Sequence, residues 1–141
     1  MNTSPAGLAL IEQSEGYREF PYQDGAGFWT VGIGHKILSG EDYSAGLTHD
    51  QAVALLQSDL APVESALASL VPESCQQCQW DALADFAYNM GVGSLRTLLR
   101  HGWDQVTAEL PRWAYAAGKV EMGLVNRRAA EIRMFTGDAP S

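Results

Sequence analysis

The 141-residue sequence has few basic residues and no long apolar run, and each shortage excludes a class of protein. Nine Lys and Arg stand against 17 Asp and Glu, which gives a formal net charge of −8. Because nucleic-acid binding depends on basic side chains that contact phosphates, we expect no nucleic-acid partner. No stretch approaches the roughly 20 apolar residues that cross a bilayer, so we also expect no stable membrane insertion.

Cysteine and histidine are scarce as well. Cys75 and Cys78 are too few for a structural zinc site, which needs four ligands. Two ordinary thiols near a helix start are expected, with a local disulfide or a redox role as the alternatives. His49 and His101 belong to no ligand pattern, so the sequence predicts no metal ion and no other cofactor.

The beginning of the sequence lacks the features of a secretory signal. Residues 1–14 have no basic segment, and their apolar run is short and ends at Glu12. We therefore expect the chain to be made in the cytoplasm. A substrate outside the membrane would then require another protein to export it.

The chain shows no repeat, linker or low-complexity tract, which predicts one domain over residues 1–141. Ser4 and Pro5 are typical of a helix start, and a helix is expected over residues 4–15. Residues 17–35 are rich in strand-forming side chains and are interrupted by the turn sequence at 24–27, which predicts a hairpin or a three-stranded sheet.

The rest of the sequence predicts helices. Thr48 and Gln51 fit a capping box, and Pro62 should break the helix that follows. Ser74 and Gln77 fit a second capping box before a helix that ends near Gly91. Shorter helices are expected near 94–101, 104–110 and 124–135. The predicted class is α+β, with a small N-terminal sheet lobe, a larger helical part and a substrate cleft between them.

Three polar residues near the predicted sheet are candidates for catalysis. Glu15 ends the first helix, Asp24 lies in the turn and Thr30 lies in the following strand. Glycoside hydrolysis needs one protonated and one ionised carboxyl group, which their surroundings must keep in different protonation states. Taken alone, the spacing fits equally well a solvated helix end at Glu15 and a local turn role for Asp24.

The wider string carries more information. Glu15-Gly16, then Tyr22-Gln23-Asp24-Gly25, then Trp29-Thr30-Val31-Gly32-Ile33-Gly34-His35 closely resembles the active-site segment of the phage-type lysozymes. These are the muramidases of glycoside hydrolase family 24, which include the T-even and lambdoid phage endolysins. Residues 84–93, 111–113, 118–120 and 123–128 resemble the family's central helix and C-terminal lobe, so the resemblance spans about residues 4–137.

The resemblance implies a lysozyme-like fold and a role for each matching residue. Glu15 would be the general acid, Asp24 would position and activate the attacking water, and Thr30 would help to hold that water, with inversion at the sugar carbon. Arg127 would pair with Glu15. His35 would be a structural, hydrogen-bonded histidine.

The resemblance also implies a substrate and partners. Lys36 and Tyr88 match substrate-contacting positions, and Thr97 matches one less closely. The expected activity is hydrolysis of the β-1,4 bond between N-acetylmuramic acid and N-acetylglucosamine in peptidoglycan glycan strands, in host-cell lysis. A monomer that acts on the cell wall in the periplasm, exported by a holin or a secretion machine, is expected.

Two alternatives remain open from the sequence. A lytic transglycosylase would use one catalytic Glu and the substrate's own hydroxyl, without Asp24 and Thr30. A peptidoglycan-binding module with a silent site would cleave nothing. Two departures from the family bear on the expected binding of substrate. It is acidic where many phage endolysins are basic, and the segment after Gly93 is shortened, which affects the C-terminal side of the cleft.

Overall fold

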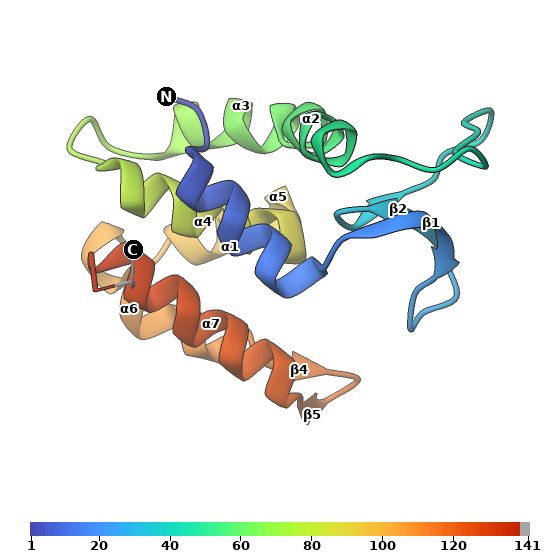
Figure 1. Ribbon diagram of the computed structural model, residues 1–141. Coiled ribbons are helices and arrows are strands. Elements are labelled where there is room, and N and C mark those ends of the chain that lie inside the picture. Colours follow the sequence, from blue (N-terminus) through green and yellow to red (C-terminus); the bar gives the residue numbers. More distant parts are fainter. Residues whose placement is uncertain (139–141) are drawn as a thin grey trace.

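The structure is a computed structural model that describes residues 1–138, so the last three residues of the predicted domain lie outside the described part. Over this range the chain forms seven α-helices and two small antiparallel sheets (Figure 1). The α-helices are α1 (Pro5–Glu15), α2 (His49–Asp59), α3 (Ala61–Leu70), α4 (Gln77–Met90), α5 (Val92–Leu99), α6 (Val106–Glu109) and α7 (Met122–Phe135). The 3-10 helices are η1 (Trp103–Gln105) and η2 (Leu110–Arg112). The strands are β1 (Arg18–Gln23), β2 (Trp29–Gly32), β3 (His35–Lys36), β4 (Tyr115–Ala116) and β5 (Lys119–Val120). The predicted α+β class is confirmed.

Helix α1 carries Glu15 as its last residue. It begins where the Ser4 side chain accepts a hydrogen bond from the Gly7 amide at 3.4 Å. The Ser4 amide in turn donates to the buried Asp81 carboxylate of α4 at 3.0 Å, which fixes α1 against that helix. The helix ends at Gly16, whose φ of 75° is one that glycine adopts without strain.

The N-terminal sheet follows directly and lies at one end of the molecule, where it contacts α2 (Figure 1). Its strands are antiparallel in the order β1-β2-β3, so the predicted sheet is confirmed. Tyr22 is paired with Thr30, and Val31 is paired with His35. The turn between β1 and β2 therefore carries Asp24 next to the strand that carries Thr30.

Helices α2 and α3 confirm two local predictions. The Gln51 amide donates to Thr48 Oγ1 at 3.1 Å and the Thr48 amide donates to Gln51 Oε1 at 2.9 Å, as in a capping box. The helix is broken at Leu60, and Pro62 lies in the first turn of α3. This break leaves Asp59 at the end of α2.

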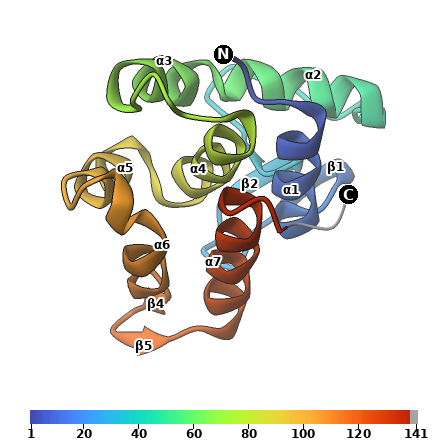
Figure 2. The same ribbon diagram turned by 90° about the vertical axis from the view of Figure 1, so that its left-hand side faces the viewer.

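Helix α4 is the centre of the helical part, with α1, α3, α5 and α7 around it (Figure 2). Trp80, Leu83 and Phe86 are at most 2% exposed. Burial of side chains of this size stabilises a fold by roughly 1.5–3 kcal/mol each. Two carboxylates, Asp81 and Asp85, are buried on the same helix.

The predicted start of α4 is wrong by two residues. Ser74 lies in a turn in which the Cys75 amide donates to the Pro72 carbonyl at 3.0 Å. The cap is Gln76, whose amide donates to Gln79 Oε1 at 2.8 Å. The sequence offers the same spacing at both places, and the turn that begins at Pro72 selects the later one.

The two cysteines are unpaired thiols beside this start. Cys75 is buried, and its burial raises the pKa of the thiol. A raised pKa opposes formation of the reactive thiolate. Separately, none of the helices within residues 1–138 has the length and apolar character needed to cross a bilayer.

The C-terminal part differs most from the prediction. The helix expected at 104–110 is divided into η1, α6 and η2, and α5 begins at Val92 directly after α4 ends. The β4–β5 hairpin was not predicted, because its strands have two residues each and its turn places Ala117 at a φ of 52°. Helix α7 starts at Met122, and the Glu121 carboxylate accepts from the amides of Gly123 and Leu124 at 3.0 Å each.

Candidate active site

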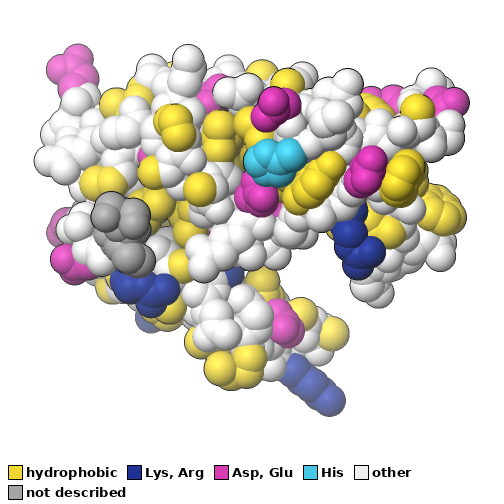
Figure 3. Space-filling view, in the orientation of Figure 1, with side chains coloured by type: hydrophobic (Ala, Val, Ile, Leu, Met, Phe, Trp, Pro, Cys, Tyr) yellow, Lys and Arg dark blue, Asp and Glu magenta, His cyan; other side chains and the backbone are white. Residues whose placement is uncertain are grey.

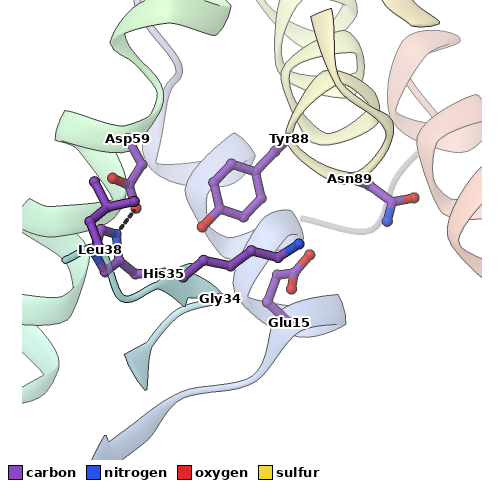
Figure 4. A pocket seen from close by; sticks show the side chains of 8 residues that line it. Glu15, Gly34, His35, Leu38, Asp59, Tyr88 and Asn89 are labelled. Atoms are coloured by element: carbon purple, nitrogen blue, oxygen red, sulfur yellow. Dashed lines mark hydrogen bonds and ion pairs between the residues drawn. The ribbon is translucent and has the colours of Figure 1, made fainter. Parts of the chain in front are cut away.

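A cleft of about 530 Å³ lies between the sheet lobe and the helical part. The residues that line it come from α1, from β3 with its flanking residues, and from the ends of α2 and α4: Glu15, Gly34, His35, Lys36, Leu38, Asp59, Tyr88 and Asn89. In Figure 4 the Glu15 carboxylate and the Tyr88 ring face the same space, with His35 and Asp59 at one side. The molecular surface is notched between the sheet lobe and the β4–β5 hairpin (Figure 3).

Glu15 is held in the cleft by a cation. Arg127 Nη1 donates to Glu15 Oε2 at 2.6 Å, and 23% of the Glu15 side chain is exposed. The same guanidinium donates from Nε and Nη2 to both oxygens of the buried Asp85, at 3.0 and 2.8 Å. Two N–H groups in a fixed fork orient the guanidinium, and the third donor is thereby directed at Glu15.

Gly34 permits the close approach of the sheet lobe to Glu15. Its φ is 72°, and a Cβ at this position would lie 2.7 Å from Glu15 Oε1. Any other residue would therefore be strained in its backbone and would displace the carboxylate. This glycine places the β2–β3 turn against the end of α1.

Asp24 is held by its own turn. Its Oδ1 accepts hydrogen bonds from the amides of Ala26 and Phe28, each at 2.9 Å. No described residue donates to the second carboxylate oxygen, which can accept a proton from a water molecule. The hydrogen bonds to one oxygen therefore orient the Asp24 carboxylate, while its other oxygen stays available to water.

Thr30 is 3% exposed and lies across the sheet from Tyr22. Its hydroxyl donates to the Phe28 carbonyl at 3.0 Å. The proton is thus engaged with the backbone, and the lone pairs of Oγ1 are left to accept a hydrogen bond from water.

Tyr22 links the two carboxylates electrostatically. Burial raises the pKa of its phenol, the Arg18 charge lowers it, and the charges of Glu15 and Asp24 both raise it further. One hydroxyl therefore senses both carboxylates. Of the three residues, Glu15 lines the cleft, whereas Asp24 in the β1–β2 turn and Thr30 on the central strand β2 are not among the residues that line it.

His35 has structural partners on both ring nitrogens. Nδ1 lies 2.7 Å from Asp59 Oδ2 and Nε2 lies 2.9 Å from Glu41 Oε1. Burial lowers the pKa of the imidazole, but the hydrogen bonds and charges of Glu41 and Asp59 outweigh it and raise the pKa overall. The Glu41 carboxyl has a pKa of about 2, because it accepts first from the Leu38 amide and then from His35. His35 thereby connects the loop after β3 to α2.

Comparison with known proteins assigns this architecture to a family. The sequence pattern of the family described as phage lysozyme matches residues 12–131. The chain belongs to the phage lysozyme family. The endolysin of Bacillus phage PZA is 36% identical over 99% of this chain, which spans only 57% of that endolysin's length. The SAR-endolysin of Escherichia phage Mu is 39% identical over 82% of this chain and 70% of its own length. The crystal structure of a mutant of P22 lysozyme is similar with a TM-score of 0.81 and 29% identity, over 96% of this chain and 99% of that one.

The substrate-contacting residues expected for this phage lysozyme chain fall into two groups. Lys36 and Tyr88 line the cleft. Lys36 Nζ lies 4.6 Å from the centre of the Phe28 ring, and the Tyr88 hydroxyl donates to the Ile33 carbonyl at 2.8 Å. Thr97 is exposed on α5, donates to the Gly93 carbonyl at 3.2 Å, and is not among the residues that line the cleft.

The sequence did not single out several residues of this phage lysozyme site. Leu38, Asp59 and Asn89 line the cleft, and Asp85 orients Arg127. Asn89 directly follows Tyr88 on α4, so the expected role of Tyr88 in substrate contact indicates that Asn89 also lies near the cleft. Asp85 had none, because an isolated acidic residue on a helix is far more often solvated than buried.

Proposed function

We propose that the chain is a muramidase that hydrolyses the β-1,4 bond between N-acetylmuramic acid and N-acetylglucosamine in peptidoglycan. The observation that carries the proposal is a pair of differently held carboxyls, Glu15 in the cleft and Asp24 in the β1–β2 turn of the adjoining sheet lobe. Glu15 is tethered by Arg127 at 2.6 Å, and Asp24 is held by two backbone amides with one oxygen left for water. The names of the relatives, endolysin and lysozyme, support the same activity.

In the proposed mechanism Glu15 protonates the glycosidic oxygen as the bond to the sugar carbon breaks. Asp24 accepts a proton from a water molecule that attacks the opposite face of the sugar, and Thr30 Oγ1 accepts that water's second hydrogen bond. A single displacement of this kind inverts the configuration at the sugar carbon. Lys36, Tyr88 and Thr97 are the proposed contacts to the glycan strand.

Lytic transglycosylation is the competing reaction. It would need Glu15 alone, so the oriented carboxylate of Asp24 and the buried hydroxyl of Thr30 favour hydrolysis. The products separate the two reactions, because hydrolysis yields reducing ends and transglycosylation yields anhydro-sugars. Anhydro-sugars as the main product would overturn the proposed mechanism.

We propose that the protein acts on the cell wall as a monomer during lysis of a host cell. Its expected place of action is the periplasm. A holin or a secretion machine is the proposed export partner. Lysis that stays dependent on a co-expressed holin would support this route, and lysis without any such partner would contradict it.

The activity is tested on Gram-negative cells stripped of their outer membrane, by turbidity and by release of reducing ends. Glu15→Gln keeps the shape of the side chain but cannot donate the catalytic proton, and it should abolish lysis. Asp24→Asn should do so as well. Glu19→Gln makes the same chemical change on an exposed residue of β1 and should leave the rate unchanged. Full lysis by Glu15→Gln, or none by the folded unmodified chain, would refute the proposal.

A further inference from the structure

The backbone of Phe28 holds two of the proposed catalytic residues. Its amide donates to Asp24 Oδ1 at 2.9 Å, and its carbonyl accepts from the Thr30 hydroxyl at 3.0 Å and from the Asp24 amide at 2.9 Å. None of these hydrogen bonds uses the side chain. The ring of Phe28 is 54% exposed, so it contributes little to the core. The ring is therefore available for contact with a ligand beside Asp24 and Thr30.

Lys36 joins the Phe28 ring to the cleft. It lines the cleft, and its Nζ lies 4.6 Å from the centre of the ring. Lys36 is paired with Thr30 across the sheet, and Thr30 is paired with Tyr22, so these three side chains share one face of the sheet. Along this face the Phe28 ring continues the cleft toward Asp24 and Thr30, which do not line it themselves.

The contact between Lys36 and the Phe28 ring is one that a ligand can replace. Lys36 is exposed and forms no ion pair with any residue in the described range 1–138. The attraction of an exposed cation to a ring face is weak, and the lysine ammonium is carried on a flexible stem. The C–H groups on one side of a sugar ring carry a slight positive charge, so they can take the place of the ammonium on the electron-rich face of the ring.

We propose that the Phe28 ring is a stacking surface for an N-acetylated sugar of the glycan strand, covered by Lys36 in the free protein and uncovered when the sugar binds. A sugar on this ring lies next to Asp24 and Thr30, because both are hydrogen-bonded to the Phe28 backbone. Phe28 is then a substrate-binding residue, and not a catalytic one. The identity of this ligand rests on the proposed function.

Two other exposed aromatic residues of the sheet lobe are placed differently. Phe20 is 55% exposed, but its ring lies against the loop before α2, where a Cβ on Gly46 would be 2.9 Å from Phe20 Cε1. Trp29 is 56% exposed and directly precedes Thr30 in β2, so its side chain points to the opposite face of the sheet. Phe20, with nearly the same exposure as Phe28, is therefore the matched control.

Kinetics on stripped cells test the role of the ring. Phe28→Leu removes the aromatic face and keeps the backbone hydrogen bonds, so KM should rise by about 3- to 10-fold with little change in kcat. Phe28→Tyr should restore KM. Phe20→Leu makes the same chemical change and should leave KM as it is. An unchanged KM in Phe28→Leu, or an equal rise in Phe20→Leu, would overturn the proposal.

NMR on the unmodified protein, with chitotriose as the probe, tests the binding directly. In the free protein the ring current of Phe28 should shift the ε-methylene protons of Lys36 upfield, because Nζ lies over the ring. Chitotriose should move the Phe28 ring resonances and remove the upfield shift of Lys36. Phe28 resonances that do not move, or an upfield shift that persists at saturation, would overturn the proposal. If chitotriose uncovers the ring but stripped cells are not lysed, the proposed function fails and the stacking surface stands.

Discussion

Replacement of Gly34 by alanine should lower the activity, because it displaces the Glu15 carboxylate, and should lower the stability, because it strains the backbone. The added Cβ would lie 2.7 Å from Glu15 Oε1, whereas ordinary contacts begin at 3.4 Å, so the carboxylate must move by about 0.7 Å. Because a misplacement of about 1 Å at a reacting group costs roughly 100-fold in rate, we expect a loss of about 10- to 100-fold. The left-handed backbone should cost about 1 kcal/mol of folding free energy as well.

Gly40→Ala is the matched control. Gly40 has a φ of 88°, and a Cβ there would meet nothing within 4 Å. Both variants should therefore lose a similar few degrees in melting temperature, measured by circular dichroism. Only Gly34→Ala should lose activity in the turbidity assay. If both variants lyse stripped cells at the same rate, the position of Glu15 seen here is not the one in which it works.

Three further substitutions test the surroundings of the site. The pKa of His35 is raised in the folded protein. Its ion pairs with Glu41 and Asp59 therefore stabilise the fold fully below about pH 6.5, where the imidazole is charged in both the folded and the unfolded state. This stabilisation is lost as the pH rises through the pKa of His35 in the folded protein. The melting temperature of the unmodified protein should therefore fall as the pH rises above about 6.5, and His35→Asn should remove this pH dependence. If His35→Asn shows the same fall in melting temperature, the ion pairs of His35 are not its cause. Arg127→Met leaves the buried Asp85 unpaired and should cost about 3–5 kcal/mol in denaturant unfolding, whereas a loss below about 1 kcal/mol would show that Asp85 finds another partner. Tyr88→Phe loses one hydrogen bond to the Ile33 carbonyl, so it should lose about 1 kcal/mol of folding free energy with little change in KM. Tyr88→Ala also removes the ring and should raise KM. Equal KM values for the two variants would exclude the ring from substrate binding.

Local signals in the sequence predicted the starts of α1 and α2 and the break between α2 and α3. Ser4, Thr48 with Gln51, and Pro62 act on the backbone within three or four residues, so their effects do not depend on the rest of the fold. The β4–β5 hairpin lacks such a signal. Its strands are too short to show an alternating pattern, and Ala117 occupies a backbone conformation usually reserved for glycine.

The candidate site likewise contains residues that a local sequence pattern predicts and residues that only the packing of the helices brings together. Glu15, Asp24 and Thr30 lie within one stretch of 16 residues, and that stretch carries a recognisable pattern. The partners of Arg127 come from α1 and α4, which lie 112 and 42 residues away in the sequence. Contacts over such separations follow from how the helices pack, and no local pattern around Asp85 or Glu131 distinguishes them from solvated residues.

The buried charges also bear on the unusual acidity of the chain. Within residues 1–138 the buried acidic residues are Asp81, Asp85 and Glu131 and the buried basic residues are Arg127 and Arg128, so they hold a net charge of only −1 and most of the formal charge of −8 lies on the surface. A surface of this sign does not attract the anionic cell wall, and long-range steering cannot speed the encounter. For the proposed activity, binding would then depend on contacts inside the cleft, which is lined by the cation Lys36, the aromatic ring of Tyr88 and the amide of Asn89. Added salt should screen the repulsion between the acidic protein surface and the anionic cell wall, without weakening these short-range contacts. The rate of lysis should therefore rise with salt concentration, whereas the rate of a cationic lysozyme is expected to fall.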